Sequence, residues 1–403
     1  MNTDLLKSHR HCMVVHNYYP IGEPRVQRQA EALAEAGAHV DVICLRHSGE
    51  PAEDYSGKVR VVRLPIQRDK SRGIIGQFFE YLTFFVFAFF KVNKLYFQKR
   101  YHVVQVHNLP DFLVFCALIP RVFGATVILD IHDLMPEFYA SRFKSGFNSL
   151  PVKLVQFQEW VSCRFASKVF TVSEWWRQSL INRGINPDKC FVVMNVANDT
   201  VFNAMDAEPR RTDTAFHLIY HGTITHRYGI DVALKAVAKA KKEIPNIQFT
   251  IHGRGEYLSE LTKLTQELRL DKTVRFSTEL MPIEELPLLL LTADVGVAPY
   301  RRDVFTDGIL PTKLMEYAAL GIPAIVARTP AIETYFTDEM VAFFEADNVD
   351  ELTEHIIQLA RNKALRQQLA RNMTAFNKKY NWTNQRLNYL NIISPDVLAQ
   401  TAW

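Results

Sequence analysis

Glycines and cations follow short apolar runs in the second half of the chain, and together they suit a phosphorylated ligand. Gly222 and Gly253 come directly after such runs, and Gly255 follows two residues later. Because glycine has no Cβ, backbone N–H groups at such a turn can approach a phosphate, although any one of these glycines also suits an ordinary turn. Arg227 and Lys313 could neutralise the charge of a diphosphate. The combination therefore predicts a diphosphate site, which no single residue would.

The most specific stretch is Asp294–Ala327, in which an apolar run ends at Pro299 and a helix is expected to begin at Pro311 and Thr312. Proline suits the first turn of a helix, and the free amide groups there would face the ligand. Glu316 lies about one turn into this helix, where its carboxylate could accept hydrogen bonds from two adjacent ribose hydroxyls. An acid near a helix N-terminus also stabilises the helix dipole, so both interpretations of Glu316 stay open.

Three histidines in the first half lie at or just beyond the ends of expected strands. They are His16, His107 and His132, and Asn108 and Asp133 directly follow the last two. In open parallel sheets, ligands bind beyond the carboxyl ends of the strands. A single histidine is usually structural, but three at one edge favour a second binding surface.

The elements that must position these residues are short β-branched runs that alternate with helical patterns. In the first half we expect strands at Cys12–His16, Val40–Leu45, Val59–Leu64, Val103–His107, Thr126–Ile131, Lys168–Val172 and Phe191–Met194. In the second half we expect them at Phe216–His221, Ile247–His252, Val274–Phe276, Val295–Ala298 and Ala324–Ala327. Helices are expected from Pro24 to Gly37, over Asp111–Phe123 and over Thr312–Leu320, among others. Strands separated by helices imply right-handed crossovers and parallel sheets.

A polar segment after Asn195, NVANDTVFNAMDAEPRRTDTA, is the best candidate for a linker. The predicted fold is therefore α/β, with two Rossmann-like doubly wound domains that face a central cleft. We expect the N-terminal domain over residues 1–200 and the C-terminal domain over 201–380. A final helix in 381–403 would pack back towards the N-terminal domain.

Composition excludes several classes of protein. The 403 residues are 48% hydrophobic and 22% charged, which is typical of a globular chain and not of a disordered one. The five cysteines are scattered without C-x-x-C pairs, which excludes a disulfide scaffold and a zinc ribbon and suits reduced thiols. The first apolar run is too short for a signal peptide, so we expect a cytoplasmic location.

The net charge of +4 conceals a local surplus, because residues 58–100 hold ten basic and two acidic side chains. Between the charges lies Ile74–Phe90, IIGQFFEYLTFFVFAFF, whose longest apolar run is far shorter than the roughly 20 residues that cross a bilayer. A helix with an aromatic face and basic flanks can lie in the headgroup layer instead. This pattern argues against nucleic acid and predicts peripheral contact with the inner face of the cytoplasmic membrane through residues 68–100. The alternative is a core helix that covers a sheet.

Several segments, in a fixed order, resemble the retaining glycosyltransferases of family 4, which adopt the GT-B fold. They are EPRVQRQAEALAEAGAHVDVICL, VHNLPDFLV, LDIHDLMPE, TVSEWWRQSL, HGTITHRYGID, IHGRGE and PTKLMEYAALGIPAIVA, and the resemblance extends over nearly the whole chain. It implies a UDP- or GDP-linked sugar as donor, no metal or other cofactor, and Glu316 as the ligand of the donor ribose. The implied donor-binding residues are Gly222, Thr223, Arg227, Gly253, Arg254, Ile309, Leu310, Thr312, Lys313 and Glu316.

The resemblance also suggests residues near the reacting sugar, and it has departures. It implies His132 and Asp133 as candidate catalytic residues that orient the sugar or acceptor. The implied acceptor-binding residues are His107, Asn108 and Asp111. Gly308 stands where the family has its first glutamate, so Asp307 is the third catalytic candidate. The family's G-R-L…K-G reads GTI…YG here, so Arg227 must supply the missing cation, together with Arg254 or Lys313.

The function expected from this resemblance is metal-independent transfer of a hexose with retention, by front-face attack and without a covalent nucleophile. If the aromatic helix touches a membrane, the acceptor is a lipid-linked glycan in polysaccharide or glycolipid biosynthesis. If it is a core helix, the acceptor is soluble. Two other functions fit the residues: a nucleotide-sugar 2-epimerase, and a non-catalytic partner subunit that binds a nucleotide sugar.

Overall fold

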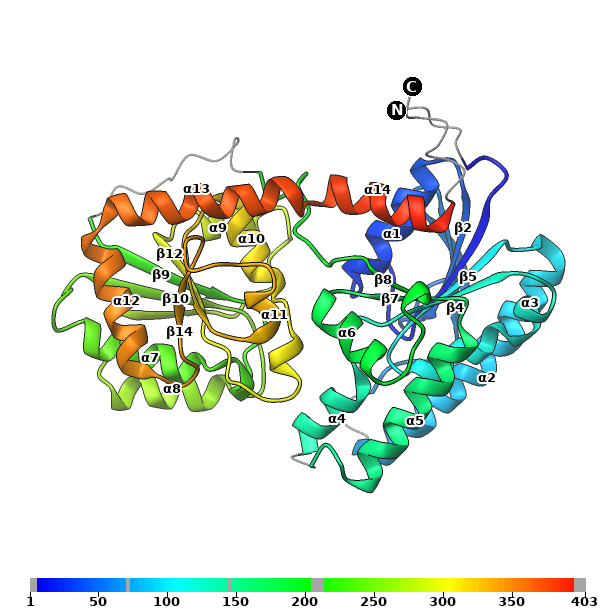
Figure 1. The fold of residues 1–403 in the computed structure, drawn as a ribbon, viewed down its shortest axis with the longest axis horizontal. Coiled ribbons are helices and arrows are strands. Elements are labelled where there is room, and N and C mark those ends of the chain that lie inside the picture. Colours follow the sequence, from blue (N-terminus) through cyan, green and yellow to red (C-terminus); the bar gives the residue numbers. More distant parts are fainter. Residues whose placement is uncertain (1–5, 70–72, 144–145, 204–213, 395–403) are drawn as a thin grey trace. The chain divides into compact units, whose positions relative to one another are not determined.

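The chain forms two compact units (Figure 1). The computed structural model describes residues 6–69, 73–143, 146–203 and 214–394. Unit 1 comprises Met1–Met194 together with Arg386–Trp403, and unit 2 comprises Asn195–Gln385. The end of the chain therefore belongs to the same unit as its beginning.

Unit 1 is built on an eight-stranded sheet with the order β3-β4-β2-β1-β5-β6-β7-β8. The strands are β1 (Arg10–Val14), β2 (His39–Leu45), β3 (Glu53–Ser56), β4 (Val59–Leu64), β5 (Val103–His107), β6 (Thr126–Asp130), β7 (Lys168–Thr171) and β8 (Cys190–Val192). Neighbouring strands are parallel except β3 and β4, which are antiparallel. The expectation of a parallel sheet is thus confirmed except at the β3 edge, whose exposed EDYS sequence has no apolar alternation to reveal a strand.

Helices flank this sheet, and one of them comes from the end of the chain. They are α1 (Pro24–Glu35), α2 (Gly73–Lys99), α3 (Leu118–Val122), α4 (Met135–Phe143), α5 (Leu150–Phe165), α6 (Glu174–Asn182) and α14 (Trp382–Ile393), with 3-10 helices η2 (Asp111–Ala117) and η3 (Pro187–Lys189). The helix expected over Asp111–Phe123 is therefore a 3-10 turn that continues into the short α3. The η2 segment packs against both α2 and α5.

The core of unit 1 joins α1, the neighbouring strands and α14. Val26 and Leu33 of α1 are fully buried against Val42 of β2, and Tyr389 of α14 is buried in the same cluster. The Tyr389 hydroxyl donates a hydrogen bond of 2.8 Å to Oε1 of Gln105 on β5. The last helix is therefore part of the core of unit 1.

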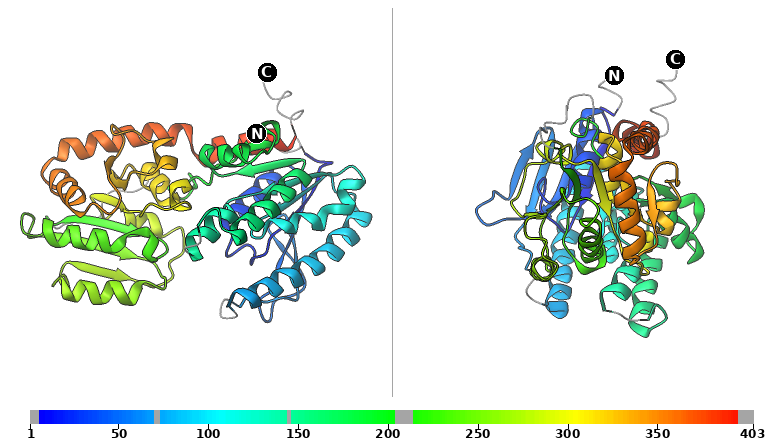
Figure 2. Two further views of the ribbon diagram at one scale, coloured as in Figure 1. Left: turned by 60° about the horizontal axis from the view of Figure 1, so that its bottom comes forward. Right: turned by 90° about the vertical axis from the view of Figure 1, so that its left-hand side faces the viewer.

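Unit 2 has a six-stranded sheet with the order β11-β10-β9-β12-β13-β14, and all of its pairs are parallel. The strands are β9 (Phe216–His221), β10 (Ile247–His252), β11 (Val274–Ser277), β12 (Val295–Ala298), β13 (Ala324–Ala327) and β14 (Ala342–Phe344). The helices are α7 (Ile230–Ala240), α8 (Leu258–Glu267), α9 (Leu286–Leu290), α10 (Thr312–Leu320), α11 (Pro330–Glu333), α12 (Val349–Arg361) and α13 (Lys363–Lys379), with η5 (His226–Tyr228) and η6 (Thr306–Gly308). Figure 2 shows helices on both faces of this sheet.

The strand order reverses between β1 and β5 in unit 1 and between β9 and β12 in unit 2. In doubly wound sheets, ligands bind at the carboxyl edge of such a reversal. The loops that follow these four strands are therefore the positions at which to seek a site. Within the described residues, no helix combines the length and the apolar character that crossing a membrane requires, including the 27-residue α2.

Candidate functional site

Arg301 links the loop after β9 to the loop after β12, at the point where the strand order of unit 2 reverses. Its backbone N–H donates to the carbonyl of Arg227 at 3.0 Å, and its guanidinium donates to the carbonyl of His226 at 2.6 Å. Two further hydrogen bonds of 2.8 Å join the guanidinium to both carboxylate oxygens of Asp231. Arg301 therefore holds the loop after β9 against the loop after β12, and its charge is already matched.

The structure requires glycine at these positions for different reasons. A Cβ on Gly253 would lie 1.9 Å from the carbonyl oxygen of Gly222, and one on Gly255 would lie 1.8 Å from that of Ile224. Both glycines therefore allow backbone segments to pack closely, instead of opening space for a phosphate. Gly222 is exposed with a φ of +112°, and an added Cβ there would meet only the end of the Lys313 side chain, at 3.5 Å. Gly222 is thus the glycine that a ligand can approach.

Lys313 of α10 reaches the same place inside a group of tyrosines. Its Nζ lies 4.0 Å from the ring centre of Tyr220, 5.1 Å from that of Tyr228 and 5.0 Å from that of Tyr300, and it donates to the Tyr300 hydroxyl at 3.1 Å. Burial lowers the pKa of Lys313 to about 7, while the neighbouring Glu316 carboxylate acts in the opposite direction. Tyrosine faces attract an ammonium ion without cancelling its charge. The site therefore offers a cation beside Gly222.

Glu316 lies beside Lys313 and contacts the end of β9. Its Oε2 lies 2.5 Å from Nε2 of His221, and Nδ1 of His221 lies 3.1 Å from the hydroxyl of Tyr317. Because α10 begins at Thr312, Glu316 is the fifth helical residue and lies beyond the first turn, where the helix dipole acts most strongly. The position therefore favours a ligand-binding role for Glu316 over helix stabilisation.

The other donor-site residues of the sequence analysis lie in three settings. Asp307 is held by two hydrogen bonds of 2.9 Å from the guanidinium of Arg302. Arg254 is exposed and donates from Nε to the carbonyl of Thr278 at 2.5 Å. The Arg227 guanidinium lies 5.3 Å from the ring centre of Phe305. The remaining positions are Thr223 and Thr312, which are exposed, Ile309, which is half-buried, and Leu310, which is buried.

Three residues of this site were not recognised from the sequence: Tyr220, Tyr228 and Tyr300. The sequence places His221 at the end of an expected strand, next to Gly222, but gives it no role. An aromatic residue at the end of a strand is usually a core residue, and nothing in the sequence relates these tyrosines to a lysine up to 93 positions away. Tyr228 alone gave a signal, because it stands where the resemblance expects a lysine.

In unit 1, the structure brings His107, Asp130 and His132 together, with possible ligand atoms within 4.8 Å of one another. Asp130 is fully buried and receives hydrogen bonds from Arg25, at 2.9 and 3.1 Å, and from Gln29 at 3.2 Å. Burial alone would raise the pKa of Asp130, but Arg25 and His107 together outweigh it and hold this pKa well below its usual range. A carboxylate already paired with a guanidinium does not suit a metal, so we assign no metal to this cluster.

Asn108 fixes the loop after β6 in place. Its Oδ1 accepts from the backbone N–H of His132 at 3.1 Å, while its Nδ2 donates to the carbonyl of Asp133 at 2.6 Å and to Asp111 at 3.0 Å. Burial lowers the pKa of His132, which favours the neutral imidazole. The structure thus gathers every residue of unit 1 that the sequence analysis proposed for the sugar and acceptor. His16 differs, because its Nε2 faces α2 and lies 3.2 Å from Oε1 of Glu80.

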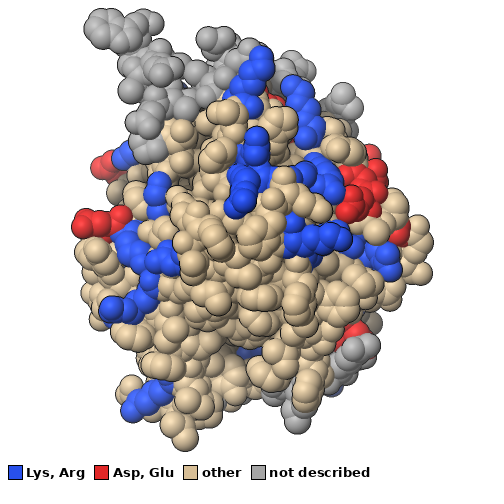
Figure 3. Space-filling view, turned by 90° about the vertical axis from the view of Figure 1, so that its right-hand side faces the viewer, with Lys and Arg blue, Asp and Glu red and all other residues tan. Residues whose placement is uncertain are grey.

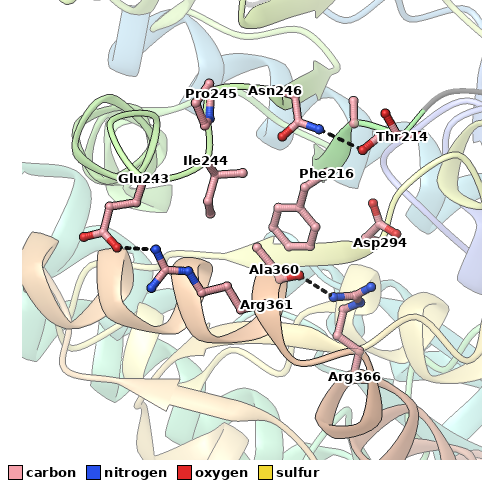
Figure 4. Close-up of a pocket in the computed structure, with 11 residues that line it drawn as sticks. Thr214, Phe216, Glu243, Ile244, Pro245, Asn246, Asp294, Ala360, Arg361 and Arg366 are labelled. Atoms are coloured by element: carbon pink, nitrogen blue, oxygen red, sulfur yellow. Dashed lines mark hydrogen bonds and ion pairs between the residues drawn. The ribbon is translucent and has the colours of Figure 1, made fainter.

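A cavity of about 360 Å³ lies at the opposite edge of the sheet of unit 2 (Figure 4). Phe216, which begins β9, and Asp294, which precedes β12, line it. Arg361 on its wall is paired with Glu243 at 2.7 Å. Because ligands of doubly wound sheets bind at the carboxyl edge, where Lys313 lies beside Gly222, we place the candidate site at Gly222, Lys313 and Glu316.

A separate surface of unit 1 is apolar and basic. On α2, Phe84, Ala88 and Val92 are fully buried, whereas a second set of side chains is exposed: Phe78, Phe79, Leu82, Val86, Phe87, Phe90 and Phe97. Neighbouring helices add exposed Leu118, Val122 and Phe123 near α3 and Leu150, Leu154 and Phe157 on α5. One face of α2 therefore belongs to the core, as the alternative interpretation expected, and the other face is exposed and apolar. Contact of that exposed face with a membrane stays a prediction.

On these helices, the acidic side chains are buried and several basic side chains are exposed. The acidic side chains of α2, η2, α4 and α5 are Glu80, Asp111, Glu137 and Glu159, and all are buried. Lys94, Arg142, Lys153 and Arg164 of the same helices are exposed. Figure 3 shows Lys and Arg side chains among uncharged ones on the side of unit 1 that carries α3, with Asp and Glu near the margins.

Comparison with known proteins agrees with both units. The Glycosyl transferase 4-like domain matches residues 22–195, and Glycosyl transferases group 1 matches residues 202–376. A chitobiosyldiphosphodolichol beta-mannosyltransferase of Candida albicans is 20% identical over 375 residues, which are 85% of this chain and 79% of that protein. For the Kluyveromyces lactis enzyme of the same name, 22% identity extends over 281 residues, 63% of this chain and 62% of the relative.

Solved structures share the fold over almost the whole chain. Sucrose-phosphate synthase from Thermosynechococcus elongatus has a TM-score of 0.77 at 17% identity, covering 97% of this chain and 100% of that one. Anabaena HepE in complex with UDP has a TM-score of 0.69 at 14% identity, covering 96% and 100%. With two matching family models in succession and two doubly wound units, the chain belongs to the family 4 type of glycosyltransferases with the GT-B fold.

Proposed function

We propose that the protein transfers a hexose from a UDP- or GDP-linked sugar to a lipid-linked glycan, in polysaccharide or glycolipid biosynthesis. The observation that carries the proposal is the grouping of Gly222, Lys313 and Glu316 at the reversal point of unit 2. Gly222 leaves room for a diphosphate, Lys313 supplies its counter-charge and Glu316 accepts hydrogen bonds from the ribose. The UDP bound by Anabaena HepE, a protein of the same fold, supports a nucleotide donor.

The chemistry follows from where charge develops. When the bond between the anomeric carbon and the β-phosphate breaks, negative charge grows on the departing diphosphate and positive character grows on the sugar. Lys313 is buried and already in place, so it stabilises that negative charge more than a solvated cation would. In this proposal Lys313 and Arg227 serve in place of a divalent metal, and the acceptor attacks from the face that the diphosphate leaves, with retention. His132, whose backbone N–H is held by Asn108, contacts the sugar or acceptor.

The acceptor class rests on the apolar and basic surface of unit 1. Exposed phenylalanines can enter the headgroup layer, and the nearby lysines and arginines attract anionic lipids. Since every carboxylate of these helices is buried, nothing on them opposes that attraction. The name of the yeast relatives, which specifies a diphosphodolichol-linked glycan, supports a lipid-linked acceptor. In this proposal the protein works at the inner face of the cytoplasmic membrane.

The test is a screen of UDP- and GDP-sugars for nucleotide release, with and without a membrane extract that contains lipid-linked acceptors. We expect release that depends on the extract, persists in EDTA and falls at least 100-fold in Glu316→Ala, a loss of about 3 kcal/mol of binding. The anomeric configuration of the isolated product tests retention directly. Release that depends only on soluble acceptors would overturn the lipid assignment, and isomerisation of the donor without extract would replace transfer by epimerisation.

A further inference from the structure

We infer that His221 is a positioning residue for the donor ribose, which it serves through Glu316. This inference rests on the function proposed above and adds to it a residue outside the implied donor set. His221 is the last residue of β9, and its side chain is buried against α10. It touches the ligand-binding carboxylate on one side and the hydroxyl of Tyr317 on the other.

The contacts form a chain that ends on the backbone of β9. The Tyr317 hydroxyl lies 3.1 Å from Nδ1 of His221 and donates to the carbonyl of Ile219, also at 3.1 Å. Tyr317 is fully buried, and its ring meets the imidazole edge to face, with ring centres 5.1 Å apart. The imidazole is therefore held on two sides, so its Nε2 points in a fixed direction.

Nε2 of His221 must carry a proton to serve Glu316, because an ionised carboxylate only accepts hydrogen bonds. This donor occupies one lone pair of Oε2. Oε1 and the second lone pair of Oε2 stay available for two adjacent hydroxyls. A free glutamate side chain has several rotamers, and fixing one of them in advance removes an entropic cost from nucleotide binding. His221 therefore acts on affinity for the ribose and not on the diphosphate.

The experiment measures, by calorimetry, the affinity of the full chain for UDP and GDP and for their 2′-deoxy forms. The ratio between the ribonucleotide and deoxyribonucleotide isolates the contribution of the hydroxyl. We expect a ratio of about ten in the wild-type protein, near one in Glu316→Ala and strongly reduced in His221→Ala. His221→Gln, whose amide can still donate, should keep most of the ratio. His217→Ala, a histidine at the other end of β9, should keep all of it.

A structural role for His221 would give a different result. If His221→Ala weakens the binding of both nucleotide forms equally, or leaves the ratio at its wild-type value, the inference is wrong. If circular dichroism shows that this variant does not fold, Tyr317→Phe tests the inference instead. It keeps His221 but removes the hydroxyl beside Nδ1, so it should also lower the ratio. Failure of the proposed function looks different, since the wild-type protein would then bind neither nucleotide, or Glu316→Ala would keep the ratio.

Discussion

The ammonium nitrogen of Lys313 lies 4.0 Å from the ring centre of Tyr220, at the end of the strand that leads to Gly222. A buried lysine in such a setting costs free energy in its charged form, and this cost explains its low pKa of about 7. An anionic ligand that reaches Gly222 would offset the cost. Binding of a diphosphate and protonation of Lys313 are therefore coupled.

Donor affinity should depend on pH because of this coupling. Below pH 7 Lys313 is already protonated and affinity is constant; above pH 7 a proton must be taken up with the ligand, so Kd rises by up to about tenfold per pH unit. Titration with an intact nucleotide sugar from pH 6 to 9 measures this, because its doubly esterified diphosphate does not itself titrate over that range. Lys313→Arg, which stays charged, should give a flat profile. A flat profile in the wild-type protein would contradict the coupling.

Gly255→Ala should destabilise the protein even without ligand. The added Cβ would lie 1.8 Å from the carbonyl oxygen of Ile224, so the backbone must shift, at a cost of about 1 to 3 kcal/mol in the free energy of unfolding. Urea denaturation measures the change. Gly146→Ala is the matched control, because nothing lies within 4 Å of its Cβ position. Equal stability of the two variants would contradict the close packing at Gly255.

Asp130→Asn should lower the stability of unit 1 by about 3 to 5 kcal/mol, because it leaves the buried Arg25 without a counter-charge. The same pair gives a pH dependence. The pKa of Asp130 is lowered in the folded protein, so its stabilising contribution is present above the unfolded pKa of about 4 and is lost as pH falls below it. Denaturation of both proteins at pH 7 and at pH 3 should show the difference shrinking in acid.

Vesicle binding should require the exposed side chains of α5 as well as those of α2. Phe79→Ser with Phe90→Ser on α2, and Leu154→Ser with Phe157→Ser on α5, should each reduce partitioning onto phosphatidylglycerol vesicles by about tenfold or more. Raised salt should weaken binding of the wild-type protein. Leu280→Ser in unit 2, at a leucine that is even more exposed, should have no effect. A loss in the α2 variant alone would confine the contact to residues 68–100.

Mutation can distinguish whether Asp307 only fixes its loop through Arg302 or contacts the reacting sugar. If Asp307 only fixes its loop through the paired hydrogen bonds to Arg302, then Asp307→Asn and Arg302→Ala should reduce kcat by similar, modest factors. If Asp307 contacts the reacting sugar, its substitution should be far more damaging than that of Arg302. Steady-state kinetics of the two variants decides between these roles.

Regular elements could be predicted from the sequence wherever burial dictates the pattern. The observed bounds of β9, β10 and α10 match the expected ones, because apolar runs define the two strands and Pro311 and Gly321 bound the helix. The edge strand β3 escaped prediction because one neighbour supports it and its side chains are exposed, so it needs no apolar alternation. The role of the tyrosines around Lys313 was not predicted for a different reason. Their role depends on which side chain enters between them, and that is a property of packing and not of spacing.

The burial of α14 in unit 1 has a consequence for biosynthesis. Tyr389 packs among residues of the first strands and helix, so unit 2 is in effect a long insertion between two parts of one core. During synthesis on the ribosome, residues 1–194 have an incomplete core until nearly two hundred further residues have been made. Unit 1 can close only after α14 has left the exit tunnel, so an N-terminal fragment that ends near Met194 would expose apolar surface and need chaperones.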